Sequence, residues 1–128
     1  MAEPLDVFLD TSKPIELLQD HLSKIIGHRL ERHNHYGECI YIGRMLDIDI
    51  RLIRASGMED DSGIAFSKYN YEISMIPFRS GLCVEGFEEM HEGVAKFLAA
   101  KLASELDCRS IVVANLQHRL ASFGPEER

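Results

Sequence analysis

The stretch "LDIDIRLIR", residues 46–54, decides the fold class because its apolar side chains stand at every second position. The apolar set is Leu46, Ile48, Ile50 and Leu52. Asp47, Asp49 and Arg51 lie between them. A period of two places successive side chains on opposite faces of a strand, whereas a helix would scatter the same residues around its axis. The stretch therefore predicts a strand with one face in the core, and with Asp47 and Asp49 together on the face in water.

Strand-like composition recurs in three other segments, which are "CIYIGRM" (39–45), "FSKYNYEISMIPF" (66–78) and "SIVVANL" (110–116). Segments 39–45 and 66–78 precede and follow the strand predicted at 46–54 through short connections. These three strands are therefore expected to pair antiparallel. Pro77 has no backbone N–H to donate, which limits its strand to an edge or to an exit from the sheet. The unbroken apolar run at 110–116 predicts a strand covered on both faces.

Helical periodicity marks two segments, 11–27 and 86–107. In the first, isoleucine and leucine recur at steps of three and four residues, and Gly27 supplies the stop. In the second, glutamates crowd the first turns, where the helix dipole favours anions. Its apolar stripe is Phe87, Met90, Val94, Leu98, Leu102 and Leu106. The helical spacing of Leu116, Leu120 and Phe123 suggests one further, short helix at the C-terminus.

The predicted order is α-β-β-β-α-β, with a possible short C-terminal helix. Residues 1–128 are expected to form a single α+β domain with frayed termini. The expected architecture is a two-layer sandwich, in which two helices cover one face of a mainly antiparallel sheet of about four strands.

Composition bounds the function. The chain has 128 residues, of which 45% are hydrophobic and 27% are charged, and its formal net charge is −7. This acidity argues against nucleic acid and anionic membranes as ligands, and it permits a basic protein partner. The sequence has no apolar run long enough to span a membrane and no secretory signal pattern at its start. Three cysteines without a CxxC spacing indicate a reducing cytoplasm rather than disulfides.

Three consecutive acids stand in "GMEDDSG" (57–63), between two predicted strands. One interpretation is a solvated turn that prevents edge pairing and keeps the chain soluble. Another is an acidic surface for a basic partner, extended by acids on the bracketing strands. The candidate partner-binding residues are then Glu59, Asp60, Asp61, Asp47, Asp49 and Glu72. The glutamates at 85, 88, 89 and 92 offer the next acidic face if this one does not bind.

The densest group of metal-ligating residue types is His28, His33, His35, Glu38 and Cys39. Their spacing matches no common zinc pattern, and neighbouring arginines disfavour a dication. We therefore expect a solvated polar connection, no metal, no cofactor and no enzymatic activity, with a metal-dependent enzyme as an alternative. Cys83, ahead of a predicted helix and of His91, is a weaker candidate for a reactive thiol.

Two stretches, "DDSGIAFSKYNYEISM" (60–75) and "RSIVVANLQHRLASF" (109–123), give the chain a family resemblance. It resembles small cytoplasmic immunity proteins of bacterial polymorphic toxin systems, above all those of contact-dependent growth inhibition. In such proteins similar stretches hold an acidic turn, an aromatic-rich strand and a C-terminal strand after a long helix. The resemblance implies a non-enzymatic inhibitor that binds a co-encoded toxin domain, often a nuclease, and blocks it. It transfers no binding residue, because each such pair uses its own surface.

Two other classes fit the same composition. Secretion chaperones are also small, acidic, α+β and cytoplasmic, and they are generally dimeric. An exposed apolar patch and a stable dimer would favour that class. An enzyme that uses the histidine region is the other, and stoichiometric zinc would favour it. The sequence leaves the oligomeric state open.

Overall fold

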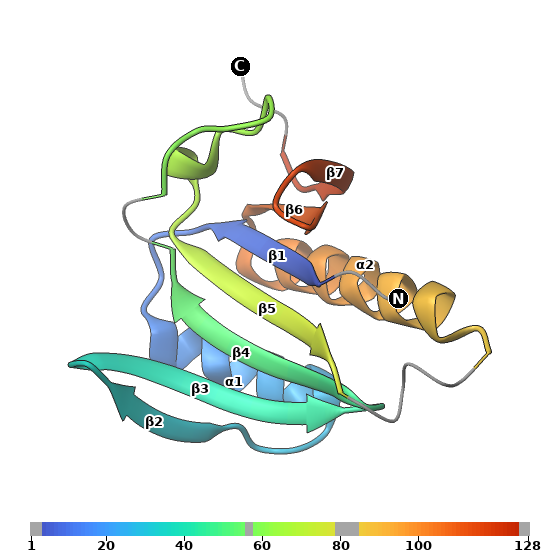
Figure 1. The fold of residues 1–128 in the computed structure, drawn as a ribbon. Helices are drawn as coiled ribbons and strands as arrows, with labels where there is room; N and C mark the ends of the chain where they lie inside the picture. Colours follow the sequence, from blue (N-terminus) through green and yellow to red (C-terminus); the bar gives the residue numbers. More distant parts are fainter. Residues whose placement is uncertain (1–3, 56–57, 79–84, 126–128) are drawn as a thin grey trace.

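The computed structural model describes residues 4–55, 58–78 and 85–125, which form one antiparallel sheet of seven strands and two α-helices (Figure 1). From edge to edge, the strand order is β2-β3-β4-β5-β1-β6-β7. The strands are β1 (Leu5–Asp10), β2 (Glu31–His35), β3 (Glu38–Met45), β4 (Ile48–Arg54), β5 (Tyr71–Pro77), β6 (Arg109–Ala114) and β7 (His118–Phe123). The helices are α1 (Ile15–Ile26) and α2 (Phe87–Leu106), and a 3₁₀ turn, η1 (Phe66–Lys68), precedes β5.

The predicted sheet of about four strands is wrong, because the sheet has seven. The order of strands and helices is β-α-β-β-β-β-α-β-β rather than α-β-β-β-α-β. Three strands were not expected: β1 at the start of the chain, the polar strand β2, and β7 in place of the predicted C-terminal helix. The molecule is therefore dominated by its sheet.

The first strand, β1, lies in the interior of the sheet. It pairs with β5 on one side and with β6 on the other. Leu5, Val7 and Leu9 point to the face that the helices cover, and Phe8 points to the opposite face. All four side chains are buried. A segment at the start of the chain thus joins the two halves of the sheet.

Both helices lie on one face of the sheet and share its main apolar cluster (Figure 1). α1 buries Ile15, Leu18 and Leu22 and ends at Gly27, whose φ of 87° suits a left-handed cap. Ile50 of β4 and Leu98 of α2 are fully buried in this cluster, as their periodic patterns predict.

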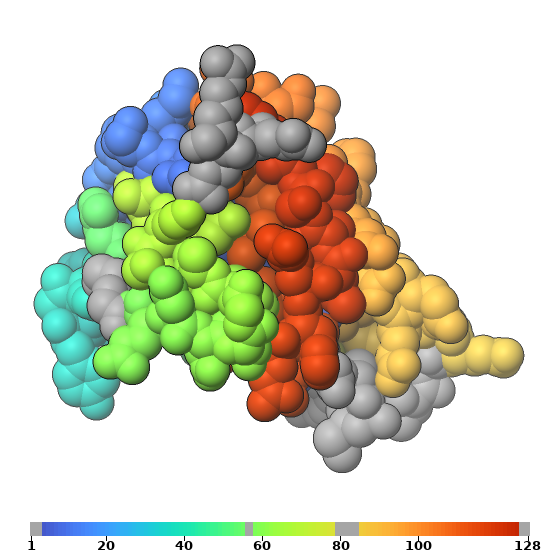
Figure 2. All heavy atoms as spheres, turned by 90° about the horizontal axis from the view of Figure 1, so that it is seen from above, coloured from blue at the N-terminus to red at the C-terminus, as the bar shows by residue number. Residues whose placement is uncertain are grey.

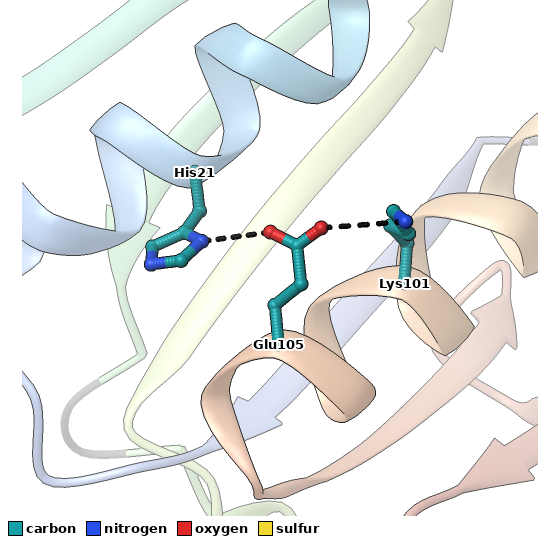
Figure 3. Close-up of polar contacts among 3 residues, drawn as sticks. All are labelled: His21, Lys101 and Glu105. Carbon is teal, nitrogen blue, oxygen red and sulfur yellow. Dashed lines mark hydrogen bonds and ion pairs between the residues drawn. The ribbon is translucent and has the colours of Figure 1, made fainter.

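A polar bridge joins the two helices at their outer side (Figure 3). His21 Nδ1 of α1 lies 2.8 Å from Glu105 Oε1 of α2, and Lys101 Nζ lies 3.6 Å from Glu105 Oε2. The hydrogen bond from His21 is the main reason that the pKa of Glu105 lies below its ordinary value. The Glu105 carboxylate therefore stays charged and links α1 to α2.

The chain turns between β3 and β4 at Leu46 and Asp47, whose φ angles are 50° and 60°. A two-residue turn of positive φ matches the right-handed twist of the strands that it joins. The strand predicted over 46–54 therefore begins only at Ile48, and Leu46 is 61% exposed instead of buried. The Phe78 N–H donates to the Asp47 carbonyl at 2.6 Å, which fastens the turn to the end of β5.

Candidate partner-binding surface

The acidic segment, residues 58–70, packs on the sheet face opposite the helices. Its Ile64, Phe66 and Tyr69 form a second apolar cluster with Phe8 of β1 and with residues of β6. The rings of Phe8 and Phe66 meet edge to face, with their centroids 5.1 Å apart. Figure 2 shows this segment, green to yellow-green, beside β7, in red. The acidic segment is thus held on the sheet by a small core of its own.

Two of its three consecutive acids bind their own segment. Asp60 Oδ1 accepts hydrogen bonds from the Ser67 N–H at 3.0 Å and from the Ser67 hydroxyl at 2.7 Å. These bonds hold the pKa of Asp60 below its ordinary value. Asp61 Oδ1 accepts from the Ser62 N–H at 2.8 Å. Glu59 is exposed, and no hydrogen bond or ion pair joins it to another residue that the structure describes.

Asp47 and Asp49 do not share a strand face, contrary to the prediction. Asp47 lies in the β3–β4 turn. Asp49 lies on β4 between two buried isoleucines, so its side chain points away from the helices. It accepts from Arg44 Nε at 2.8 Å, and Arg44 also lies over the Phe78 ring, 3.8 Å from its centroid. The charge of Asp49 is therefore balanced within the chain.

The register of β4 on β5 places Asp47 far from the acidic segment. Ile48 pairs with Pro77 at one end of these strands, and Arg54 pairs with Tyr71 at the other. The acidic segment leads directly into Tyr71, so Asp47 lies beyond the opposite end of the sheet. At the usual rise of a strand, the distance along β5 from Tyr71 to Pro77 is about 20 Å. The six predicted residues therefore do not form one patch.

Glu72 lies beside Asp6 on the face opposite the helices. In the β1–β5 register, Asp6 pairs with Ser74, and Phe8 pairs with Glu72. Asp6 is only 5% exposed. Burial, and next a hydrogen bond with Glu72, raise the pKa of Asp6 to about 9. At neutral pH the Asp6 carboxyl therefore keeps its proton, so Asp6 adds no negative charge to this face.

The open face, which we define as the outward side of β3, β4 and β5, carries charges of both signs. Arg44 pairs with Asp49 there, and Arg51 is exposed. Partly exposed isoleucines lie among these charges, at positions 40, 42, 53 and 76. Apolar side chains with polar groups around them are typical of protein interfaces. The open face thus offers contact area next to the acidic segment, without a strong charge of its own.

Beside the acidic segment, Arg109 and Arg119 help to line a hollow of about 180 Å³ between Tyr69 and β7.

A second acidic group lies on α2, where Glu88 and Glu89 occupy the first turn and Glu92 pairs with Lys96 at 3.0 Å. The acidic segment and the start of α2 are therefore two separate groups of neighbouring acids.

The histidine region forms no coordination site in the described ranges. His28 Nε2 lies 2.8 Å from a backbone carbonyl of β3. His33 and His35 share one side of β2, whereas Cys39 lies on the other side of the β2–β3 pair. Among residues 4–55, 58–78 and 85–125, no three His, Cys, Asp or Glu side chains come together as a metal ion requires.

The absence of tightly bound zinc stays a prediction. Elemental analysis of protein purified without added metal checks it, and we expect far less than one zinc per chain. One zinc per chain would contradict the prediction and would favour the enzyme alternative.

The sequence patterns did not predict that two polar side chains, Asp6 and His91, are buried. Asp6 interrupts the apolar run "LDVFLD", and His91 occupies an inner position of α2. His91 Nε2 lies 2.9 Å from the Met75 carbonyl, and burial lowers the pKa of this histidine, which favours its neutral form. Of the cysteines, Cys83 lies outside the described residues, while burial raises the pKa of Cys108 to about 11 and leaves its thiol unreactive.

Comparison of the chain with family models, with curated proteins and with solved structures finds no match. In the described ranges, no helix combines the length and the apolar character needed to cross a membrane. The resemblance to immunity proteins therefore depends on the two sequence stretches alone.

Proposed function

We propose that the protein is an immunity protein that binds a basic, co-encoded toxin domain in the bacterial cytoplasm and blocks its activity. The observation that carries this proposal is the fixed position of the acidic segment. Its apolar residues are seated on the sheet, and Asp60 is held by two hydrogen bonds from Ser67. A connection between strands that served only to remain hydrated would not need these apolar contacts and hydrogen bonds.

A loop that is held in place before binding loses little conformational freedom when the partner arrives. Its carboxylates can then receive lysine or arginine side chains in charge-assisted hydrogen bonds. The net charge of −7 attracts a cationic domain from a distance. The open face, with its partly exposed isoleucines, adds the apolar contact that a firm complex requires.

The test begins with the reading frame directly upstream of the gene for this chain. Its C-terminal domain is expressed in bacteria with and without the chain, and growth is followed over a range of toxin induction. We expect growth arrest by the toxin domain alone and protection by the chain. Calorimetric titration of the two purified proteins should give a one-to-one complex. Growth arrest that the chain does not relieve would contradict the proposal.

A secretion chaperone is the second candidate, and exposed apolar surface on α2 favours it. Phe97 of α2 is 58% exposed. A chaperone would bind an extended segment of a secreted protein, whereas an immunity protein would bind a folded domain and stop its activity. Binding to the folded toxin domain, together with loss of that domain's activity, therefore separates the two candidates.

A further inference from the structure

The outer side of α2 carries an uncharged stripe, the α2 stripe, which consists of Met90, Gly93, Phe97, Ala100 and Ser104. These residues recur at steps of three and four, so they share one side of the helix. All are partly or fully exposed, and Phe97 is 58% exposed. The inner side of the same helix is buried against the sheet. A helix that is apolar on two sides is expected to bury both.

The structure of the single chain does not require a glycine at position 93. Glycine inside a helix lowers stability relative to alanine because it loses more backbone freedom on folding. The φ of Gly93 is not positive. Within 4 Å of the place that a Cβ would take, the structure describes no neighbouring atom. Neither backbone conformation nor packing in the described part of the chain therefore requires a glycine here.

We propose that the α2 stripe is the interface of a two-fold symmetric dimer of this chain, in which the two α2 helices pack antiparallel. Positions 93 and 97 are equally far from position 95, and so are positions 90 and 100. A two-fold axis level with Ala95 therefore sets Phe97 of each copy level with Gly93 of the other. It also sets Met90 level with Ala100 of the second copy. Each bulky side chain meets a small one, which makes the surface complementary to itself.

The charges along α2 fit a second copy in the same orientation. Glu88, Glu89 and Glu92 outnumber Lys96 in the first half of the helix, whereas Lys101 and Glu105 balance each other in the second half. Antiparallel packing brings the acidic half of one copy to the balanced half of the other. Parallel packing would bring acids against acids. Since each copy has a net charge of −7, the antiparallel arrangement is the one that limits repulsion.

Sedimentation velocity of the full chain tests the proposal, over concentrations from about 1 μM to about 1 mM, which span firm to weak association. We expect the wild type to form a dimer in this range. Phe97→Glu buries a charge in the interface and should leave a folded monomer. Gly93→Gln should raise the thermal midpoint of the monomer, because glutamine is the better helix former. The same change should weaken the dimer by about tenfold or more, because its side chain occupies the space over which Phe97 of the second copy packs.

Tyr36→Glu is the matched control, because Tyr36 is a 97% exposed aromatic residue at the tip of the β2–β3 hairpin, away from α2. This variant should stay dimeric. A wild type that is monomeric throughout the range overturns the proposal. So does a dimer that survives both α2 variants, since its interface must lie elsewhere. The inference does not depend on the proposed function, because self-association is measured without any toxin domain.

Discussion

Asp60 has a role within its own segment, and its two hydrogen bonds from Ser67 can be separated from its charge. Asparagine at this position keeps an oxygen that accepts both bonds, whereas alanine removes it. We therefore expect Asp60→Ala to lower the melting temperature at neutral pH and Asp60→Asn to leave it close to that of the wild type. Thermal denaturation followed by circular dichroism measures both. Equal melting temperatures for the alanine variant and the wild type would mean that these bonds contribute nothing.

Asp60 should also make the free energy of unfolding depend on pH in the acid range. The pKa of Asp60 lies below its ordinary value of 3.8 in the folded chain. Its contribution to stability is therefore complete above about pH 3.8 and is lost as the pH falls through the lower, folded-state pKa. The asparagine variant has no proton to gain at this position, so it should lack this part of the acid destabilisation.

Asp6 predicts a pH dependence of the opposite sign. Its pKa is raised to about 9 in the folded chain, from an ordinary value of 3.8. Between these values the folded chain holds a proton that the unfolded chain releases, so the free energy of unfolding falls as the pH rises. Asp6→Asn removes this proton, while its amide can still donate to Glu72. We expect a smaller fall in unfolding free energy with pH for this variant than for the wild type.

Urea denaturation at several pH values between about 7 and 9 makes this comparison. His91 does not interfere in this range, because its lowered pKa costs stability only when the pH falls below about 6.5. The wild type should lose stability across this range more steeply than Asp6→Asn does. Identical slopes for the two proteins would mean that Asp6 is ionised in the folded chain.

At the scale of secondary-structure elements, the sheet and the helices meet at Ile50 and Leu98, both fully buried. Truncating either to alanine removes buried methyl groups and leaves a cavity, so each change should lower the free energy of unfolding by about 2–5 kcal/mol. Ile76→Ala is the control, because Ile76 of β5 is 39% exposed on the other face, and we expect a loss below about 1 kcal/mol there. Urea denaturation gives all three values. A loss below about 1 kcal/mol at Ile50 or Leu98 would remove that residue from the core.

How far the elements could be predicted depends on whether burial leaves a pattern in the sequence. β4 and α2 each bury one face, and their apolar residues recur with the matching period. β2 is an edge strand whose five side chains are all exposed, so only its pairing with β3 makes it a strand. β1 alternates Leu5, Val7 and Leu9 with other residues, but Phe8 and Asp6 are buried as well, which obscures the period.

The false C-terminal helix has a specific cause. The register of β7 on β6 shifts between Val112 and Val113, which pair with Ala121 and Arg119. Leu120 is therefore an extra residue in β7, a bulge. With this bulge, Leu120 and Phe123, which are three positions apart in the sequence, both pack against the main apolar cluster. Their spacing imitates one helical turn. A bulge is set by pairing with another strand, so a single segment does not reveal it.

For the candidate site, the position of the acidic segment could be read from the sequence, but the neighbours of its acids could not. The side-chain hydrogen bond of Glu72 with Asp6 joins strands that are far apart in the chain. The separation of Asp47 from Asp49 follows from a turn of two residues with positive φ, at a leucine and an aspartate rather than at the usual glycine or asparagine.

At the scale of the whole molecule, the net charge is −7, and two groups of acids lie at different elements, the acidic segment and the start of α2. General attraction of a basic partner depends on the total charge, whereas docking depends on where the carboxylates lie. Two variants with equal total charge can therefore tell the two effects apart. The first is Glu59→Gln, Asp60→Asn, Asp61→Asn, and the matched control is Glu85→Gln, Glu88→Gln, Glu89→Gln.

Each triple variant removes three negative charges and keeps the size and hydrogen-bonding oxygens of the side chains. If the acidic segment docks the toxin domain, its variant should slow association, flatten the dependence of association on salt, and speed dissociation, while the fold stays intact. The α2 variant should change only the salt-dependent part of the association rate, because it lowers the general attraction alone. Stopped-flow association at several salt concentrations, with dissociation by competition, measures these rates. Equal effects of the two variants would reduce the acidic segment to a source of general charge. Unchanged rates and full protection of growth with the first variant would show that its carboxylates only keep the turn hydrated, and a larger effect of the second would move the interface to the start of α2.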